Sequence, residues 1–419
     1  MLGLLSRHRV FAAYCASLLW LLAASLWFAK LTEKGLGHVP VIAAIIGGAI
    51  VSYVLIWKVL SLTAPRLTDW ASETHIAPRP LSRVKSLVLL GLVLLFAAVF
   101  LAHMMTLGHI PILAAMSSND DQAISVIRQQ GYFGLPLWLR YMSDYSVKAL
   151  GPALLVITYL YRKRSFWFVL LICSLYSLAL FVRILPIFFL APLLLLALFQ
   201  RRWLHLALTA GLMALLITVA TSAAAPGIRN TYIPEKENST VLSKADSDAA
   251  AKYIATEKVK KDWRSGSTLY AMFERALFVP GQVIDQWFYF YSRPAAREHG
   301  CGYRTLARFM DCDYVHIPNK LYQAFYPENT QRGMLGSLNA ASFMSDYANF
   351  GFAGIAVSTI LTALFFCMAT IIYRDHPLAL PLNIPLIMVS METSIITALN
   401  SGAGWLVMTT LFLYFFRTK

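Results

Sequence analysis

The sequence predicts an all-α polytopic membrane protein of about ten transmembrane helices. The chain has 419 residues, is 58% hydrophobic and has a mean hydropathy of +0.60, which is unusual for a soluble globular protein. Apolar runs of about 20 residues recur, and this length crosses roughly 30 Å of hydrocarbon. The runs lack the alternation typical of barrel strands, so helix is the spanning element that the sequence supports.

Ten apolar runs are candidates for these spans, of which the fourth to sixth are short. They are residues 10–29, 38–60, 86–107, 147–161, 165–182, 184–200, 203–222, 350–373, 379–399 and 402–416. Basic residues mark every second loop, which fixes orientation by the positive-inside rule. The basic loops include Arg162 to Arg164 and Arg201 with Arg202. This pattern predicts that both termini are cytoplasmic.

Three regions follow from this topology. Residues 1–222 hold the first seven helices, with a smaller external loop at 108–146. Residues 223–349, here called the insert, form a large external loop, and residues 350–419 hold the last three helices. A loop as long as the insert is seldom a simple connection.

The net charge of +15 does not indicate nucleic-acid binding. Of the 36 basic residues, 15 lie in the insert together with 13 acidic ones, so the insert carries only about two excess positive charges. The others lie in short loops or at span ends, where membrane topology explains them. We therefore expect the lipid bilayer, and no nucleic acid, as a partner.

The smaller external loop contains the start of an amphipathic helix. Ser117 to Asp121 offers a capping side chain followed by acidic groups that favour the positive end of a helix dipole. Apolar Ala123, Ile124 and Ile127 follow at helical spacing, and Gly131 is expected to end the run. This helix is expected to lie on the outer surface.

The second half of the insert predicts two more amphipathic helices. Ser267 is a candidate cap for a helix that reaches Val279, and Pro280 with Gly281 is expected to interrupt it. A second helix then runs from Gln282 to Tyr291 with a dense group of aromatic residues. Such rings suit the membrane interface, so both helices are expected to rest on or dip into the outer leaflet.

Two cysteines lie outside the apolar runs. Cys301 and Cys312 are in the insert, eleven positions apart. An oxidising compartment would favour a disulfide between them, and a reducing one would leave two free thiols. The spacing leaves both interpretations open.

Arginine provides the main functional signal. Arg183 stands between the fifth and sixth apolar runs with almost no linker, and Arg275 lies in the first helix of the insert. A guanidinium matches the oxygens of phosphate, so both are candidate anchors for an anionic substrate. Arg229 is a weaker candidate, and Arg304 and Arg308 lie on one face of any helix there. The alternative is a snorkelling side chain, a structural ion pair or a solvated face.

The end of the insert carries recognisable motifs. Gly336-Ser337-Leu338-Asn339 is followed by Tyr347-Ala348-Asn349-Phe350-Gly351-Phe352-Ala353-Gly354, and Arg275-Ala276-Leu277-Phe278-Val279-Pro280 comes earlier. These segments and the topology resemble the Wzy-type O-antigen polymerases, which are similar to the GT-C membrane glycosyltransferases. The family commonly has an acidic residue at the position of Asn349. Its basic position between two short spans falls on Arg183.

The resemblance implies glycosyl transfer between two undecaprenyl diphosphate-linked oligosaccharides at the periplasmic face. Arg275 and Arg183 would stabilise the departing diphosphate without a metal or other cofactor. Asp346 is the favoured general base, with Asp311, His316 and Glu392 as alternatives.

Other residues are expected to contact the substrate in this interpretation. Arg229, Arg304 and Arg308 would bind its anionic or sugar groups, Tyr347 and Asn339 would position sugar, and Trp287 would line the lipid or glycan path. Glu392 is the one carboxylate well inside a predicted span. It is either a substrate-binding group or a polar residue bonded to a neighbouring helix.

Two further functions share parts of this pattern. An O-antigen ligase uses the same donor with a different acceptor, and a non-enzymatic flippase or transporter handles the same lipid-linked oligosaccharide. The sequence shows no internal repeat and few charges within the predicted spans, which disfavours the common transporter architectures. The favoured location is the inner membrane of a bacterium, where a chain-length regulator protein is a candidate partner.

Overall fold

The computed structural model describes most of the chain as packed helices. It describes residues 7–32, 37–65, 81–118, 121–161, 163–182, 184–223, 247–248, 250, 252–253, 274–331, 336–399 and 404–416. Within these ranges there is no β-strand. Five helices are long and apolar enough to cross a membrane by length and composition: α2 (Arg9–Thr32), α3 (Val39–Thr63), α5 (Arg83–Leu107), α12 (Trp203–Ala223) and α19 (Ser342–Tyr373). The all-α membrane class predicted from the sequence therefore agrees with the fold, and the number of ten spans stays a prediction.

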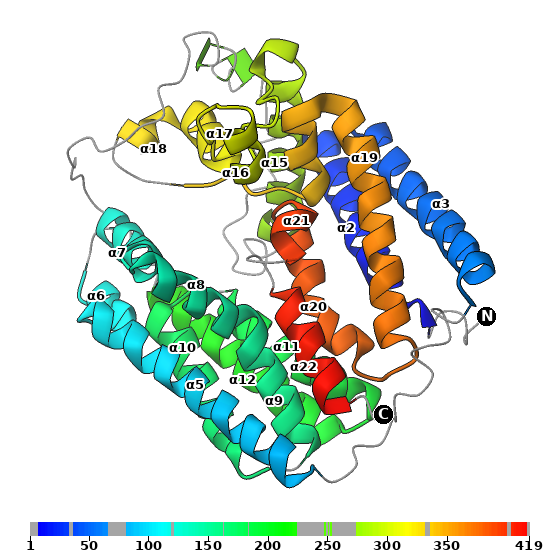
Figure 1. The fold of residues 1–419 in the computed structure, drawn as a ribbon. Coiled ribbons are helices and arrows are strands. Elements are labelled where there is room, and N and C mark those ends of the chain that lie inside the picture. The colour runs from blue at the N-terminus through cyan, green and yellow to red at the C-terminus, as the bar shows by residue number, and fades with distance from the viewer. Residues whose placement is uncertain are drawn as a thin grey trace.

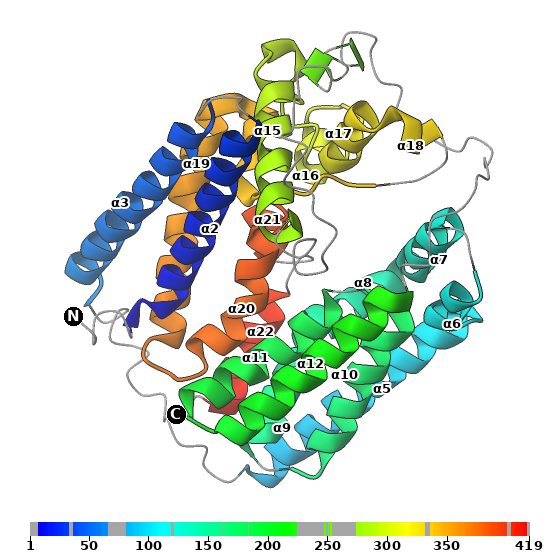
Figure 2. The same cartoon turned by 180° about the vertical axis from the view of Figure 1, so that it is seen from behind.

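The helices form two bundles that α20 (Ala379–Ser390) joins (Figures 1 and 2). In the first bundle α2, α3 and α19 pack together, with α15 (Val279–Tyr291) along α2. The second contains α5, α12, α9 (Gly151–Leu160), α10 (Ser165–Leu180) and α11 (Leu185–Phe199). Helix α20 contacts α2 on one side and α11 on the other. Helix α22 (Trp405–Phe416) packs on α20 and α9.

The fourth apolar run belongs to a longer helix than its hydropathy predicts. Segments α8 (Leu137–Tyr145), η2 (Ser146–Leu150) and α9 follow one another without a break, and η2 is a π-helix. At 1.5 Å per residue the composite helix is about 36 Å long. Its amphipathic start lies outside the predicted span of 147–161, because a polar face hides it from a hydropathy count. A π-helix inside an α-helix often marks a functional position.

The ninth and tenth predicted spans are only half-length helices. Helices α20 and α22 each have 12 residues, about 18 Å, which is well short of a crossing. Between them the chain turns at residues 391–394 and forms the short α21 (Ile395–Thr397). Glu392 lies on this turn and is exposed. The expectation that Glu392 sits within a continuous helix is therefore wrong, because the helix ends two residues before it.

The smaller external loop folds as two helices, α6 (Pro111–Met116) and α7 (Asp121–Phe133). The amphipathic helix predicted after Ser117 is confirmed. It continues through Gly131, which packs against Leu180, and ends at Phe133, so Gly131 does not end it. Both helices pack on a small apolar cluster made by Ile112, Ala115, Ile124, Phe181 and Ala220.

Helix α15 enters the first bundle from the insert. The π-helix η4 (Glu274–Phe278) leads directly into it, with Pro280 in its first turn. The expected interruption at Pro280 is therefore wrong, because the first turn of a helix tolerates proline. Gly281 is the point of closest approach: a Cβ there would lie 2.4 Å from the Ala24 carbonyl oxygen of α2. The predicted interfacial helix is thus a buried neighbour of α2.

The helices that follow α15 in the insert are short (Figure 1). They are η5 (Pro294–Ala296), α16 (Arg304–Phe309), α17 (Ile317–Phe325) and α18 (Pro327–Gln331).

Helix α19 folds back on itself at Gly351. This residue has φ +65° and ψ −147°, a conformation that is essentially restricted to glycine. A Cβ on Gly354 would lie 2.3 Å from the carbonyl oxygen of Asp346, although residues eight apart in a straight helix are about 12 Å apart. Residues 342–350 therefore form a separate arm that lies against the start of the span. The span predicted from 350 begins at this fold-back, one residue later.

We predict that Gly351→Ala destabilises the protein by about 1–3 kcal/mol, because alanine is strained in this conformation. Its Cβ would also meet the Arg297 guanidinium, 2.7 Å from Cζ. Gly211→Ala in α12 is the matched control, since nothing lies within 4 Å of a Cβ there. Thermal unfolding in detergent measures both variants. Equal unfolding midpoints for the two would show that the fold-back carries no strain for alanine.

Candidate functional site

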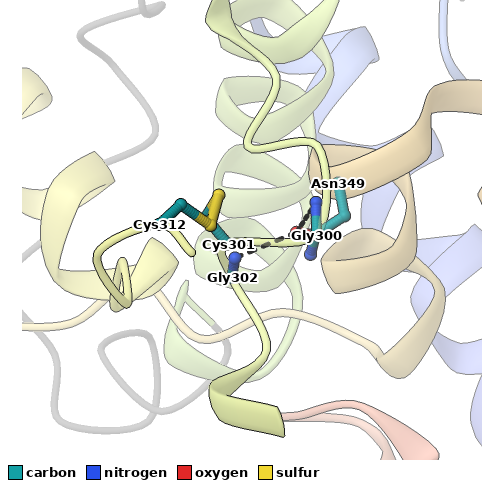
Figure 3. Close-up of a disulfide and its surroundings, with 5 residues drawn as sticks. All are labelled: Gly300, Cys301, Gly302, Cys312 and Asn349. Carbon is teal, nitrogen blue, oxygen red and sulfur yellow. Dashed lines mark hydrogen bonds between the residues drawn. A yellow bond between two sulfur atoms is a disulfide. The ribbon is translucent and has the colours of Figure 1, made fainter. Parts of the chain in front are cut away.

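The side chain of Asn349 on α19 makes hydrogen bonds to the loop around Cys301 in the insert (Figure 3). Its Oδ1 accepts hydrogen bonds from the backbone N–H groups of Gly300 and Gly302, both at 3.0 Å. Its Nδ2 donates to the Ser345 carbonyl at 2.8 Å. The backbone N–H of Glu298 donates to the Ala348 carbonyl at 3.0 Å beside it. The loop 298–302 is therefore fixed to the last turn of the arm.

The adjacent cysteines form a disulfide. Cys301 and Cys312 are joined with a Cα–Cα distance of 6.0 Å, which decides between the two states that the sequence leaves open. The ring that they close contains α16. Further backbone bonds tighten it, from the N–H of Cys312 to the Ala307 carbonyl and from Val315 to Cys301, both at 3.0 Å. Helix α16 thus has a defined place despite its six residues.

Asp346 and Tyr303 form the centre of the site. The Tyr303 hydroxyl, one residue beyond the fixed loop, donates to Oδ1 of Asp346 on the arm. Oδ2 is buried near Ser358 and makes no hydrogen bond of good geometry to a described residue. Burial, and then the Asp346 carboxylate, raise the pKa of Tyr303. The phenol therefore stays protonated and remains a donor to the carboxylate.

Arg304 connects this centre to the second bundle. Its side chain lies 3.5 Å from the Tyr141 hydroxyl of α8, and its guanidinium carbon is 5.0 Å from the centroid of the Tyr314 ring. A guanidinium over an aromatic face is held by cation–π attraction. Arg304 and Arg308 are both exposed on α16. Helix α16 therefore presents two exposed cationic groups shortly after Tyr303 in the chain.

A second group of charges lies on α8, η2 and the turn after α20. The Lys148 ammonium and the Asp144 carboxylate form an ion pair at 3.1 Å. Lys148 also interacts electrostatically with Glu392. A break in a helix, with charged groups beside it, suits a region of a membrane protein that is in contact with water or a polar ligand.

The structure separates the other predicted residues. Asn339 is exposed in the extended segment before α19. Tyr347 is buried between Phe288 and Phe352, with ring centroids at 4.9 and 5.3 Å. Trp287 is fully buried and donates from Nε1 to the Leu338 carbonyl at 2.9 Å. Tyr347 and Trp287 thus hold the arm and the segment before it against α15, so their geometry fits packing better than sugar contact.

Of the three other predicted arginines, only Arg275 lies within the described residues. The backbone of Arg275 lies in η4, which packs against α2. Arg183 and Arg229 lie outside the described residues. Their roles stay predictions.

Three residues of these two groups and their surroundings are absent from the candidate site residues predicted from the sequence. Tyr303 has no motif around it, and Lys148 is hidden at the start of an apolar run. Arg297 lies with its guanidinium against Gly351 and close to Tyr347. The one available signal is the glycine of the Phe350-Gly351 pair, because a residue without a side chain leaves room for a neighbour.

The described residues contain no group of three or more His, Cys, Asp or Glu side chains that could hold a metal ion. Comparison with protein-family models, with characterised proteins and with solved structures gives no match.

We predict that Trp287→Phe lowers stability by about 1–3 kcal/mol, because the buried Leu338 carbonyl loses its donor while the aromatic packing is largely kept. Trp167→Phe serves as a control, since Trp167 is 71% exposed on α10 and should change stability by no more than about 0.5 kcal/mol. Unfolding midpoints in one detergent compare the two. A loss at Trp287 no larger than at Trp167 would contradict the anchoring role.

Proposed function

We propose that this protein is a glycosyltransferase that polymerises lipid-linked oligosaccharide repeat units at the outer face of a bacterial inner membrane. The observation that carries the proposal is the pairing of Asp346 with Tyr303, which lies directly before the exposed Arg304 of α16 in the chain. A carboxylate and a cation are the two groups that transfer from a diphosphate carrier requires. The motifs around Arg275 and Gly351 support the same reaction by resemblance.

The proposed reaction moves the growing glycan from one undecaprenyl diphosphate to a repeat unit on a second carrier. A hydroxyl of the acceptor sugar attacks the anomeric carbon of the donor. The bond from that carbon to the diphosphate oxygen breaks, and undecaprenyl diphosphate leaves with the bonding electron pair. Asp346 accepts the hydroxyl proton, so that charge and atoms balance.

The guanidinium groups act on the leaving group in this scheme. Negative charge increases on the bridging oxygen as the bond breaks, and a preorganised cation stabilises it most at that moment. Arg304, which directly follows Tyr303 in the chain and is exposed, is proposed for this role. Arg275 and Arg183 are assigned to it from the sequence, and Arg308 and Arg229 are assigned to binding of the substrate's anionic or sugar groups.

Tyr303 has a supporting role at the carboxylate. Its donated hydrogen bond occupies Oδ1 and orients the Asp346 carboxylate.

A flippase or transporter is the second candidate, and the broken helices favour it. Half-length helices that meet at charged residues are typical of transporter binding sites. Here α20 ends beside Glu392, which interacts with Lys148 in the π-helix η2. The ligase remains an alternative with the same donor, because no described residue distinguishes the acceptors.

We predict that Asp346→Asn reduces polymer formation by about 10²–10⁴-fold, the contribution typical of a general base. Asp313→Asn, at an exposed position of the same insert, should leave it unchanged. Gels of surface polysaccharide from a strain lacking the native gene and carrying each variant measure chain length. Single repeat units on the surface support a polymerase. Long chains from Asp346→Asn would exclude Asp346 as the base, and the absence of any repeat unit at the surface would favour the flippase.

We also predict that Arg275→Ala and Arg183→Ala each leave the protein in the membrane at normal levels and restrict the polysaccharide to single repeat units. Arg201→Ala, a basic residue of the loop between α11 and α12, is the control and should yield full-length chains. Immunoblots of membrane fractions report protein level, and gels report chain length. A normal chain-length distribution in either variant would remove that arginine from the proposed leaving-group site.

A further inference from the structure

We infer that Asn349 is a positioning residue, which together with the Cys301–Cys312 disulfide holds Tyr303 against Asp346. This inference rests on the proposed function only in giving Asp346 a catalytic task; the placement itself is independent of any reaction. Asn349 touches none of the groups assigned to chemistry. It acts on them through the loop that leads into Tyr303.

The first support is the order of residues along the loop. Gly300 and Gly302 donate to one oxygen of Asn349, Cys301 lies between them, and Tyr303 comes next. Two fixed N–H groups on either side of Cys301 leave the backbone before Tyr303 little freedom. The disulfide then fixes the far end of α16 to the same point.

The second support is the lack of space around the contact. A Cβ on Gly302 would lie 2.7 Å from Nδ2 of Asn349, and a Cβ on Gly300 would lie 2.7 Å from the Met310 sulfur. Gly300 also has φ +101°, which favours glycine. The loop therefore packs closely around the Asn349 side-chain amide, and its backbone has little room for another conformation.

The third support is that both partners of the Tyr303–Asp346 hydrogen bond are connected to Asn349. Asp346 is on the same arm, three residues before it, and Tyr303 is reached through the loop. Without the amide, the loop would keep its backbone hydrogen bonds from Glu298 and His299 to the arm, and the segment from Gly300 to Tyr303 would lose both bonds to Asn349. Reduction of the disulfide by a dithiol transfers two electrons and two protons to the cysteines and opens the ring that they close.

Substitution of Asn349 separates its two hydrogen-bonding roles. Aspartate keeps an oxygen that accepts from Gly300 and Gly302 and loses only the donor to Ser345, whereas leucine has similar size and loses both. Asn349→Asp should therefore keep Tyr303 in place, and Asn349→Leu should release it. Asn319→Leu, at an exposed position on α17, is the control.

Nitration of tyrosine by tetranitromethane reports the position of Tyr303 without reference to activity. In protein purified into nanodiscs, we expect Tyr303 to be nitrated at least about tenfold faster in Asn349→Leu and in the Cys301→Ser/Cys312→Ser double variant than in the wild type or Asn349→Asp. The exposed Tyr314 is an internal reference that should react equally in all. Equal nitration of Tyr303 in Asn349→Leu and the wild type would overturn the inference.

Hydrogen exchange of residues 298–312 covers the case in which a variant fails to fold. Wild-type protein reduced with dithiothreitol after folding should exchange faster in this segment, while the double serine variant should not respond to the reductant. No change on reduction of the wild type would overturn the role of the disulfide.

Polymer formation by the same proteins separates this inference from the proposed function. Loss of activity in Asn349→Leu with rescue in Asn349→Asp supports positioning of a catalytic group. Fast nitration of Tyr303 in Asn349→Leu, together with a wild type that forms no polymer, would support positioning of Tyr303 by Asn349 and reject the polymerase. Full activity in Asn349→Leu despite fast nitration would overturn the claim that the positioning serves Asp346.

Discussion

The fold-back of α19 at Gly351 is the constraint on which the rest of the site depends. It turns a helix into an arm and a span that lie against each other, so that Asp346 on the arm is adjacent to Gly354 and Ser358 on the span. The last turn of the arm then offers Asn349 and two backbone carbonyls to the loop 298–302. Without this reversal, residues 342–350 would extend the span outward and Asp346 would face away from Tyr303.

The arrangement shows how an insert built of small helices acquires a defined structure. Its small helices contribute little apolar area of their own, and α16 has only six residues. Stability comes instead from α15, which is buried against α2, and from Trp287, Tyr347 and the disulfide. The buried pair of Lys320 and Glu298, at 2.9 Å, adds a further link between α17 and the fixed loop. The exposed arginines of α16 therefore lie on a part of the insert that these contacts hold in place.

The sequence was sufficient for the helical class and for the ends of α2, α3 and α5, because long apolar runs have few alternative structures. It was also sufficient to direct attention to Asp346 and to the Phe350-Gly351 motif. It failed where backbone geometry decides. Hydropathy treats residues 379–399 as one span, although the helix breaks beside Glu392. The proline at position 280 was expected to interrupt a helix, although the helix there is continuous and holds Pro280 in the first turn of α15. Tyr303 could not be found because its role depends on a loop fixed by a residue 46 positions later.

The close approach of Gly281 to Ala24 has a consequence for biogenesis. Helix α2 is made first, yet the surface that Gly281 covers gains its partner only when most of the chain has been synthesised. Synthesis of α15 is therefore a precondition for completing the first bundle, and a chain arrested before residue 281 would leave α2 without this neighbour.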